Sequence, residues 1–216
     1  MFNSFYFCLS HGQPIEHSNP SYLRSAIVEF IRSWNNDGKS PERFCAASLG
    51  RDLDEYFEFI MDSTSWGGAV ELSILSEIFC AQVEVADIQS GNIYSIGGKE
   101  AMWRSPTISP PTQCMFLLYD GTHYDAVYDE RPIGTLTMFD VADKGVREQV
   151  QDLVKSLRES NQYTDTSSIN LECGQCRTKL IGTTDATAHA LKTGHDSFEE
   201  YSNSELNLLS SMKKHE

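Results

Sequence analysis

The chain has 216 residues, of which 31 are acidic and 17 basic, and its formal net charge at pH 7 is −14. This charge disfavours binding to the phosphates of nucleic acids. Hydrophobic residues make up 40% of the chain and aromatic residues 11%, which excludes global disorder. No run of about eighteen apolar residues predicts a membrane span, and the lack of any Lys or Arg before Arg24 argues against a signal peptide.

The first third of the chain has the apolar spacing of helices. The apolar segment 2–9 begins abruptly and predicts a buried element. A helix is expected over residues 20–34, and two more over 52–61 and 69–79, because apolar residues recur there every three or four positions. In the first of these helices the apolar residues are Leu23, Ile27, Phe30, Ile31 and Trp34.

The middle of the chain predicts strands. Residues 82–88 alternate roughly as a strand does, and a Ser-Gly-Asn turn leads into 93–96. The continuous apolar run 114–119 is typical of a buried central strand, and 124–127 is a further extended segment. An amphipathic helix is expected over 146–159. Helices followed by strands predict an α+β or α/β domain.

Near the C-terminus, Cys173 and Cys176 are followed by His189 and His195, in the spacing of a Cys2His2 zinc site. We expect two thiolates from a tight turn and two imidazoles from one face of the following helix to hold one Zn²⁺. Acidic and basic residues balance within this finger, which favours a protein partner over DNA.

The other four cysteines stand singly in largely apolar surroundings, which favours a reducing compartment over a disulfide framework. We therefore expect the protein in the cytoplasm, with the nucleus as a second location. The four are Cys8, Cys45, Cys80 and Cys114.

His123 directly follows the predicted central strand, and Asp125 lies two residues further on. Residues i and i+2 of an extended segment share a face, so the carboxylate can orient the imidazole as a general base for a nucleophile. On this evidence alone, a histidine in a turn is more often a plain surface residue.

Trp66, Gly67 and Gly68 precede the third predicted helix. Glycines allow close backbone approach, and a Trp beside them suits a wall that holds an extended peptide. The alternative is a helix start with a packing Trp, which the segment alone favours.

Taken together, residues 66–76 (WGGAVELSILS), residues 117–125 (LLYDGTHYD) and the finger resemble the ovarian tumour (OTU) family of cysteine deubiquitinases. The group most similar is that of the ubiquitin thioesterases with a C-terminal Cys2His2 finger. The resemblance covers most of residues 1–200 and implies a papain-like cysteine protease fold, with a small central sheet flanked by helices, plus the zinc finger.

By that resemblance, His123 is the general base, Asp125 a candidate partner, and Trp66, Gly67 and Gly68 border the groove for the ubiquitin tail. The implied activity is hydrolysis of isopeptide bonds at the C-terminus of ubiquitin. The implied partners are ubiquitin, polyubiquitin and a hexameric AAA ATPase, although the adaptor domain that contacts the ATPase is absent here. The implied process is degradation of misfolded proteins from the endoplasmic reticulum.

The sequence departs from the family at the nucleophile. The family's Asp-x-x-Cys motif would fall immediately before Met1, and Cys8 would lie about two helical turns further on, on the order of 12 Å away. We expect Cys8 to be a core residue and the chain as it stands to hydrolyse ubiquitin negligibly. Two interpretations stay open: an enzyme lacking its first segment, or a catalytically dead ubiquitin-binding module.

Four parts are expected along the chain. Residues 1–129 form the OTU domain without its nucleophile segment, and 130–168 a C-terminal extension helix and linker. Residues 169–198 form the zinc finger, and 199–216 a tail with no strong structural signal.

Overall fold

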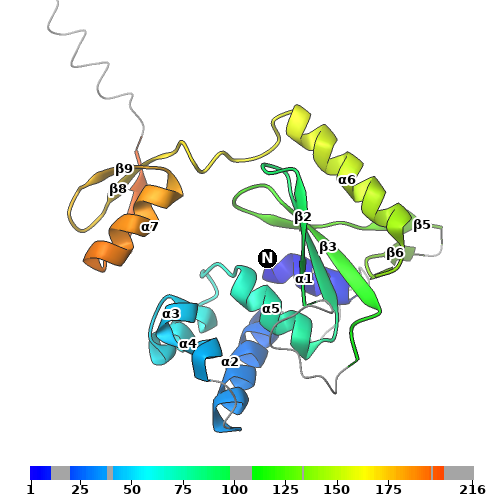
Figure 1. Cartoon of the computed structure of the whole chain (residues 1–216), viewed down its shortest axis with the longest axis horizontal. Coiled ribbons are helices and arrows are strands. Elements are labelled where there is room, and N and C mark those ends of the chain that lie inside the picture. Colours follow the sequence, from blue (N-terminus) through cyan, green and yellow to red (C-terminus); the bar gives the residue numbers. More distant parts are fainter. Residues whose placement is uncertain (11–19, 38–40, 98–108, 133, 196, 202–216) are drawn as a thin grey trace, which may run out of the picture. The chain divides into compact units, whose positions relative to one another are not determined.

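The computed structural model describes residues 1–10, 20–37, 41–97, 109–132, 134–195 and 197–201 (Figure 1). The chain divides into two compact units, Met1–Tyr163 and Thr164–Glu216. Most of the predicted tail, residues 202–216, lies outside the described residues. No helix in the described ranges is both long and apolar enough to cross a bilayer.

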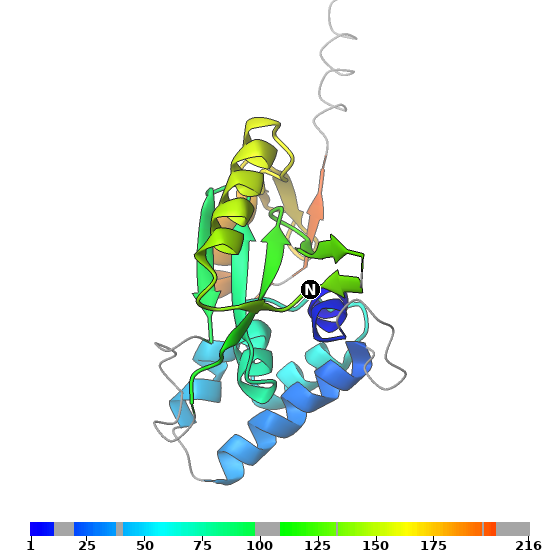
Figure 2. The ribbon, with the colours of Figure 1, turned by 90° about the vertical axis from the view of Figure 1, so that its right-hand side faces the viewer.

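The helices predicted from apolar spacing are confirmed in the first unit, and segment 2–9 is also a helix. Their bounds are α1 Phe2–Leu9, α2 Pro20–Asn36, α4 Leu53–Met61, α5 Ala69–Ile78 and α6 Lys144–Glu159. Two short elements that were not predicted fall between them, a 3-10 turn at Pro41–Phe44 and α3 at Ala46–Leu49. Each spans about one turn, too short to show periodicity. Figure 2 shows α1 (dark blue) next to the green strands, with α2 (blue) beside it.

The central sheet has the strand order β2-β1-β3-β4, and β7 also pairs with β3. β1 and β3 run parallel, while the other pairs are antiparallel. Strands β5 and β6 form a separate two-stranded ribbon. The bounds are β1 Gln82–Asp87, β2 Asn92–Ile96, β3 Gln113–Tyr119, β4 Tyr124–Ala126, β5 Asp129–Arg131, β6 Gly134–Leu136 and β7 Phe139–Asp140. The last three were not predicted.

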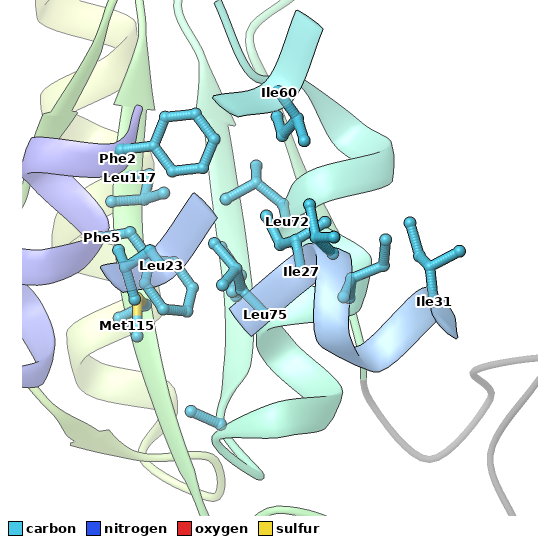
Figure 3. Packing of buried hydrophobic residues seen from close by; sticks show 14 of the residues in the cluster. Phe2, Phe5, Leu23, Ile27, Ile31, Ile60, Leu72, Leu75, Met115 and Leu117 are labelled. Carbon is cyan, nitrogen blue, oxygen red and sulfur yellow. The ribbon is translucent and has the colours of Figure 1, made fainter. Parts of the chain in front are cut away.

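One face of this sheet supports the main core. Val83 and Val85 of β1 lie in register with Met115 and Leu117 of β3, and all four are buried. They belong to one apolar cluster with side chains of α1, α2, α4 and α5. Figure 3 shows this packing, with Phe2, Phe5, Leu23, Ile27, Leu72 and Leu75 converging from three helices.

The opposite face of the sheet carries the alternate residues and is covered by α6. Ala86 and Phe116 cluster there with Val150 and Val154. Glu84 of β1 is also buried on this face. Its carboxylate accepts hydrogen bonds from neighbouring side chains and, at 2.5 Å, from the guanidinium of Arg147 on α6. In Figure 1 the strands accordingly lie between α6 and the group of α2, α4 and α5. Both faces of β1 and β3 are thus buried, as the continuous apolar run predicts.

The second unit is small. Its strand order is β10-β8-β9, and one helix, α7, follows the β8–β9 hairpin. The bounds are β8 Asn170–Cys173, β9 Lys179–Ile181, α7 Gly182–Thr193 and β10 Phe198–Glu200. Its buried apolar side chains, within the described ranges, are those of Leu171, Cys173 and Ala186. The unit therefore has very little apolar core of its own.

Candidate functional site

A pocket of about 220 Å³ in the first unit joins three of the predicted site residues, His123, Trp66 and Gly67, while Gly68 and Asp125 are not among its lining residues. Four segments that are distant in sequence form its wall: the start of α1, the start of α2, the loop before α5 and the loop before β4. The lining residues are Met1, Phe2, Asn3, Pro20, Arg24, Ser63, Thr64, Ser65, Trp66, Gly67, His123 and Tyr124. The structure thus brings His123 together with Trp66 and Gly67, which are more than fifty positions earlier in the chain.

The turn that carries His123 is organised by Asp120. One carboxylate oxygen of Asp120 accepts hydrogen bonds from the backbone N–H groups of His123 at 2.6 Å and Thr122 at 2.8 Å. Burial raises the pKa of Asp120, but these hydrogen bonds outweigh it and the net pKa lies below its usual value. Asp120 is thus ionised at neutral pH and holds the backbone that presents the imidazole. The side chain of His123 is 66% exposed, so its ring is open to a substrate.

Asp125 lies on β4, opposite Leu118, and is exposed. Of the interactions recorded between described residues, Nδ1 of His123 is 3.0 Å from the Thr122 hydroxyl and 3.9 Å from Asp120 Oδ2, and none joins it to Asp125. Asp125 as the orienting partner therefore stays a prediction. Asp120 was missed in the sequence, although an Asp three residues before a His in a Gly-containing turn is a recognisable turn signal.

Trp66 and Gly67 have different roles in the pocket wall. The Trp66 side chain is exposed, and its ring centre lies 5.0 Å from that of His123. It therefore does not pack in the core, contrary to the alternative that the segment alone favours. At Gly67, a Cβ atom would come within 2.9 Å of the Phe2 ring and would also clash with Met1. A glycine is needed there because the start of α1 approaches so closely.

Gly68 shows no comparable crowding, because the nearest atom to an added Cβ is 3.9 Å away. Its backbone N–H donates to Glu71 at 2.6 Å, which satisfies one free donor at the start of α5. Glu71 is buried, and it also accepts a hydrogen bond from the Tyr56 hydroxyl at 2.5 Å. Burial, followed by this carboxylate, raises the pKa of Tyr56. Gly68 thus acts through the helix start and not through a close approach.

The N-terminal turn of α1 is fixed next to His123. The hydroxyl of Ser4 donates a hydrogen bond to the carbonyl of Tyr124, the residue after His123. Cys8, further along the same helix, is fully buried, and burial raises the pKa of its thiol to about 12. A thiol of that kind is a poor nucleophile. The expectation that Cys8 is a core residue is confirmed, and no cysteine is among the residues that line the described pocket.

In the second unit, the four predicted metal ligands come together. The ligand atoms of Cys173, Cys176, His189 and His195 all lie within 4.8 Å of one another. The distance from Cys173 Sγ to His195 Nδ1 is 3.5 Å, and that from Cys176 Sγ to His189 Nε2 is 3.4 Å. Zn–S bonds of about 2.3 Å and Zn–N bonds of about 2.0 Å at tetrahedral angles require S···N distances of about 3.5 Å. The cluster therefore fits a tetrahedral zinc ion.

The local backbone explains how the four ligands meet. Cys173 ends β8, and the tight turn after it includes Arg177 at φ 59°. Hydrogen bonds from the Thr178 side chain and backbone lower the pKa of Cys176 to about 6, which favours the thiolate, the form that binds zinc. Cys173 also pairs with Phe198 of β10, which draws the segment after α7 back to the hairpin.

The expectation that both imidazoles come from one helix face is wrong. α7 carries His189 but ends at Thr193, and Gly194 follows in the left-handed conformation at φ 76°. Two residues six positions apart on a continuous helix point about 120° apart, so they do not share one helix face. Ending the helix at Gly194 allows His195 to turn back towards the two thiols.

Comparisons with known proteins match both units. Residues 167–201 match the family model for the ubiquitin thioesterase OTU1 C-terminal C2H2-type zinc finger. Ubiquitin thioesterase Otu1 of Drosophila melanogaster is 32% identical over 202 residues, which are 93% of this chain and 53% of that protein. Ubiquitin thioesterase OTU1 of Gallus gallus is 32% identical over 203 residues, which are 93% of this chain and 62% of that protein. The chain thus spans little more than half the length of these relatives.

Among solved structures, an ovarian tumour (OTU) domain in complex with ubiquitin matches with a TM-score of 0.57 and 18% identity. The match covers 76% of this chain and 85% of that one, and it shows that the fold is shared. The predicted fold class, a small central sheet flanked by helices plus a zinc finger, is confirmed. With relatives above 30% identity along nearly its whole length and a C-terminal part that matches the OTU1 finger, this chain is similar to the ubiquitin thioesterases of the OTU family that carry a C-terminal Cys2His2 finger.

Proposed function

We propose that this chain provides the catalytic framework of a thiol-dependent deubiquitinase. One observation carries the proposal: His123, Trp66 and the N-terminal turn of α1 meet in a single pocket. The relatives named as ubiquitin thioesterases supply the substrate class. The groove that would receive the ubiquitin tail runs past Trp66 and Gly67, and the isopeptide bond would be cleaved beside His123.

In the proposed reaction, the thiol of the family's Asp-x-x-Cys segment lies at the N-terminal end of α1, where the helix dipole favours the thiolate. His123 accepts the thiol proton, and the sulfur attacks the carbonyl carbon of the last ubiquitin glycine. His123 then donates the proton to the leaving lysine amine, and a thioester forms. Water, deprotonated by the same imidazole, hydrolyses the thioester and releases ubiquitin with a free carboxylate. Asp125, or Asp120 through the turn, would orient the imidazole.

We propose that Cys173, Cys176, His189 and His195 bind one Zn²⁺. The spacing and mutual distances of these residues support a closed four-ligand site, which leaves no open position for catalysis. Zinc here would have a structural role, supplying the free energy that folds the second unit.

The process and partners follow from the family. We propose that the protein acts on ubiquitin and polyubiquitin during disposal of misfolded proteins from the endoplasmic reticulum, with a hexameric AAA ATPase as partner. We propose the cytoplasm as its location, with the nucleus second. The acidic net charge of −14 supports a contact with the basic tail of ubiquitin.

The test adds an Asp-x-x-Cys segment directly before Met1 and measures release of a fluorophore from the C-terminus of ubiquitin. Turnover is expected, and both an Asp-x-x-Ser extension and His123→Ala in the active chain should abolish most of it. Folded, zinc-loaded protein that binds ubiquitin but never cleaves it would instead identify a ubiquitin-binding module. If it neither binds nor cleaves ubiquitin, the proposed function is wrong.

A further inference from the structure

Arg24 is a buried cation that links three parts of the pocket wall. It lies on α2 and is only 5% exposed. Its Nη1 atom donates hydrogen bonds to the Ile60 carbonyl at 2.8 Å and to the Ser65 hydroxyl at 2.7 Å, and its Nη2 atom donates to the Ser65 carbonyl at 2.8 Å. The guanidinium carbon also lies 4.2 Å from the centre of the Phe2 ring, in the first turn of α1.

The acceptors around Arg24 are unusual for a buried cation. Each hydrogen-bond partner recorded for it among the described residues is a carbonyl or hydroxyl oxygen, including a longer bond to the Ser63 carbonyl at 3.3 Å. Burial lowers its pKa, and the more distant charges of Asp62 and Glu71 only partly compensate. A buried charge without a directly bonded anion is expensive, and an apolar side chain could fill the same volume. The planar fork of the guanidinium must therefore do something an apolar residue cannot.

What the fork holds is the loop that leads into Trp66. Its donors fix the backbone carbonyls of Ser63 and Ser65, and the Phe2 ring on which it stacks lies against Gly67. Ser63, Ser65 and Gly67 all line the pocket. Backbone between two such fixed points cannot shift without breaking hydrogen bonds or opening the contact with α1.

We propose that Arg24 is a positioning residue for substrate: it holds the 63–67 loop in the shape that receives the extended tail beside His123. This inference rests on the proposed function of the same pocket. Arg24 touches no reacting atom, so its loss should weaken substrate binding far more than it slows the chemical step.

Arg43 provides a matched control for a purely structural role. It is likewise buried at 6%, it lies over the rings of Trp34 and Phe44, and it donates to Glu77 at 2.8 Å. It does not line the described pocket. Replacing either arginine by lysine keeps the charge and removes the fork, so the two changes differ mainly in what the fork holds.

The experiment compares R24K with R43K in the chain extended by Asp-x-x-Cys, below the unfolding temperature of both. R24K should raise KM about tenfold relative to R43K, while kcat changes less than about threefold. Equal KM values for the two variants, or a loss confined to kcat, would overturn the inference. The backbone amides of residues 63–67 should also exchange hydrogen faster in R24K and not in R43K.

A milder pair covers the case in which R24K does not fold. S65A removes a hydroxyl acceptor of Arg24, whereas S25A removes a hydroxyl of α2 that does not line the pocket. S65A should raise KM about threefold and S25A should leave it unchanged. If the extended wild-type chain is folded but inactive, the proposed function fails, and titration with ubiquitin then decides about Arg24. R24K must then bind ubiquitin about tenfold more weakly than R43K does, and equal affinities for ubiquitin would overturn the inference.

Discussion

The two units of this chain reach stability by different routes. The first unit buries large apolar side chains on both faces of a sheet, in two clusters that involve most of its helices. The second buries three apolar side chains within its described residues and gathers two thiols and two imidazoles instead. A domain of a few tens of residues rarely buries enough apolar surface to fold alone. We therefore expect metal coordination to replace burial there.

The largest expected effect follows from removing the metal. Stripping zinc with a chelator, or replacing Cys173 by Ser, should unfold the second unit completely and leave the first unit folded, because only the second depends on coordination. Amide spectra of the two units, followed alongside zinc content, provide the measurement. If the amide resonances of the second unit stayed well dispersed in zinc-free protein, its small apolar core would be sufficient to fold it.

The second prediction removes a buried apolar side chain from the first unit and leaves the metal site of the second unit unchanged. Leu75 is fully buried in the main cluster, so Leu75→Ala should lower the free energy of unfolding of that unit by about 2–5 kcal/mol. Leu153→Ala on α6, where the side chain is 40% exposed, should cost much less. Zinc content should stay at one per chain in both. Denaturant unfolding gives the two free energies, and a loss of zinc in Leu75→Ala would mean that the units are not independent.

Backbone geometry offers a sharper test inside the second unit. Gly182 has φ 73°, and an added Cβ would lie 2.8 Å from the carbonyl carbon of Ser167. Gly194 has φ 76° but no atom within 4 Å of such a Cβ. Gly194→Ala should therefore cost only about 1–2 kcal/mol of conformational strain, and Gly182→Ala clearly more. Competition with a zinc chelator would rank the two, and equal zinc affinities would contradict the close approach at Gly182.

The smallest expected effect is a difference in reactivity between cysteines of the native protein, because the reactivity of each thiol depends on its local environment. Burial raises the pKa values of Cys8 and Cys114 to about 12, while backbone hydrogen bonds from Ser48 lower that of exposed Cys45. At pH 8 only about one in 10⁴ of the buried thiols would be thiolate, so iodoacetamide should label Cys45 before Cys8 and Cys114. The thiolate fraction, and with it the rate at a buried thiol, should rise about tenfold per pH unit below that pKa. Rapid labelling of Cys8 in native protein would show that α1 opens readily.

The elements that the sequence predicted well are those with a repeating pattern. The helices around Leu23, Tyr56 and Leu72 and the strands of Val83 and Leu117 all lie where apolar spacing placed them, since burial on a packed sheet enforces that spacing. Strands β5, β6 and β7 were not predicted, because two or three residues carry no periodicity. Their existence depends on what lies opposite them.

The candidate sites divide in the same way. The metal ligands were predictable because their spacing along the chain is itself the signal, although the backbone that delivers His195 was not. The pocket was only partly predictable. Trp66 and His123 were identified, and Asp120 was missed although its turn signal is local. Arg24 acts through backbone atoms of residues that no local pattern connects to it.

The buried pair of Glu84 and Arg147 sets a limit on how this protein can be cut. A fragment that ended at residue 129 would keep every strand from β1 to β4 but would lose α6 and with it the guanidinium that neutralises Glu84. It would also uncover Phe116 and the apolar residues beside it on that face. An unpaired buried carboxylate destabilises a fold, and a newly exposed apolar surface promotes aggregation. The shortest soluble piece of the first unit should therefore extend through Glu159, so that α6 and the pocket belong to one folding unit.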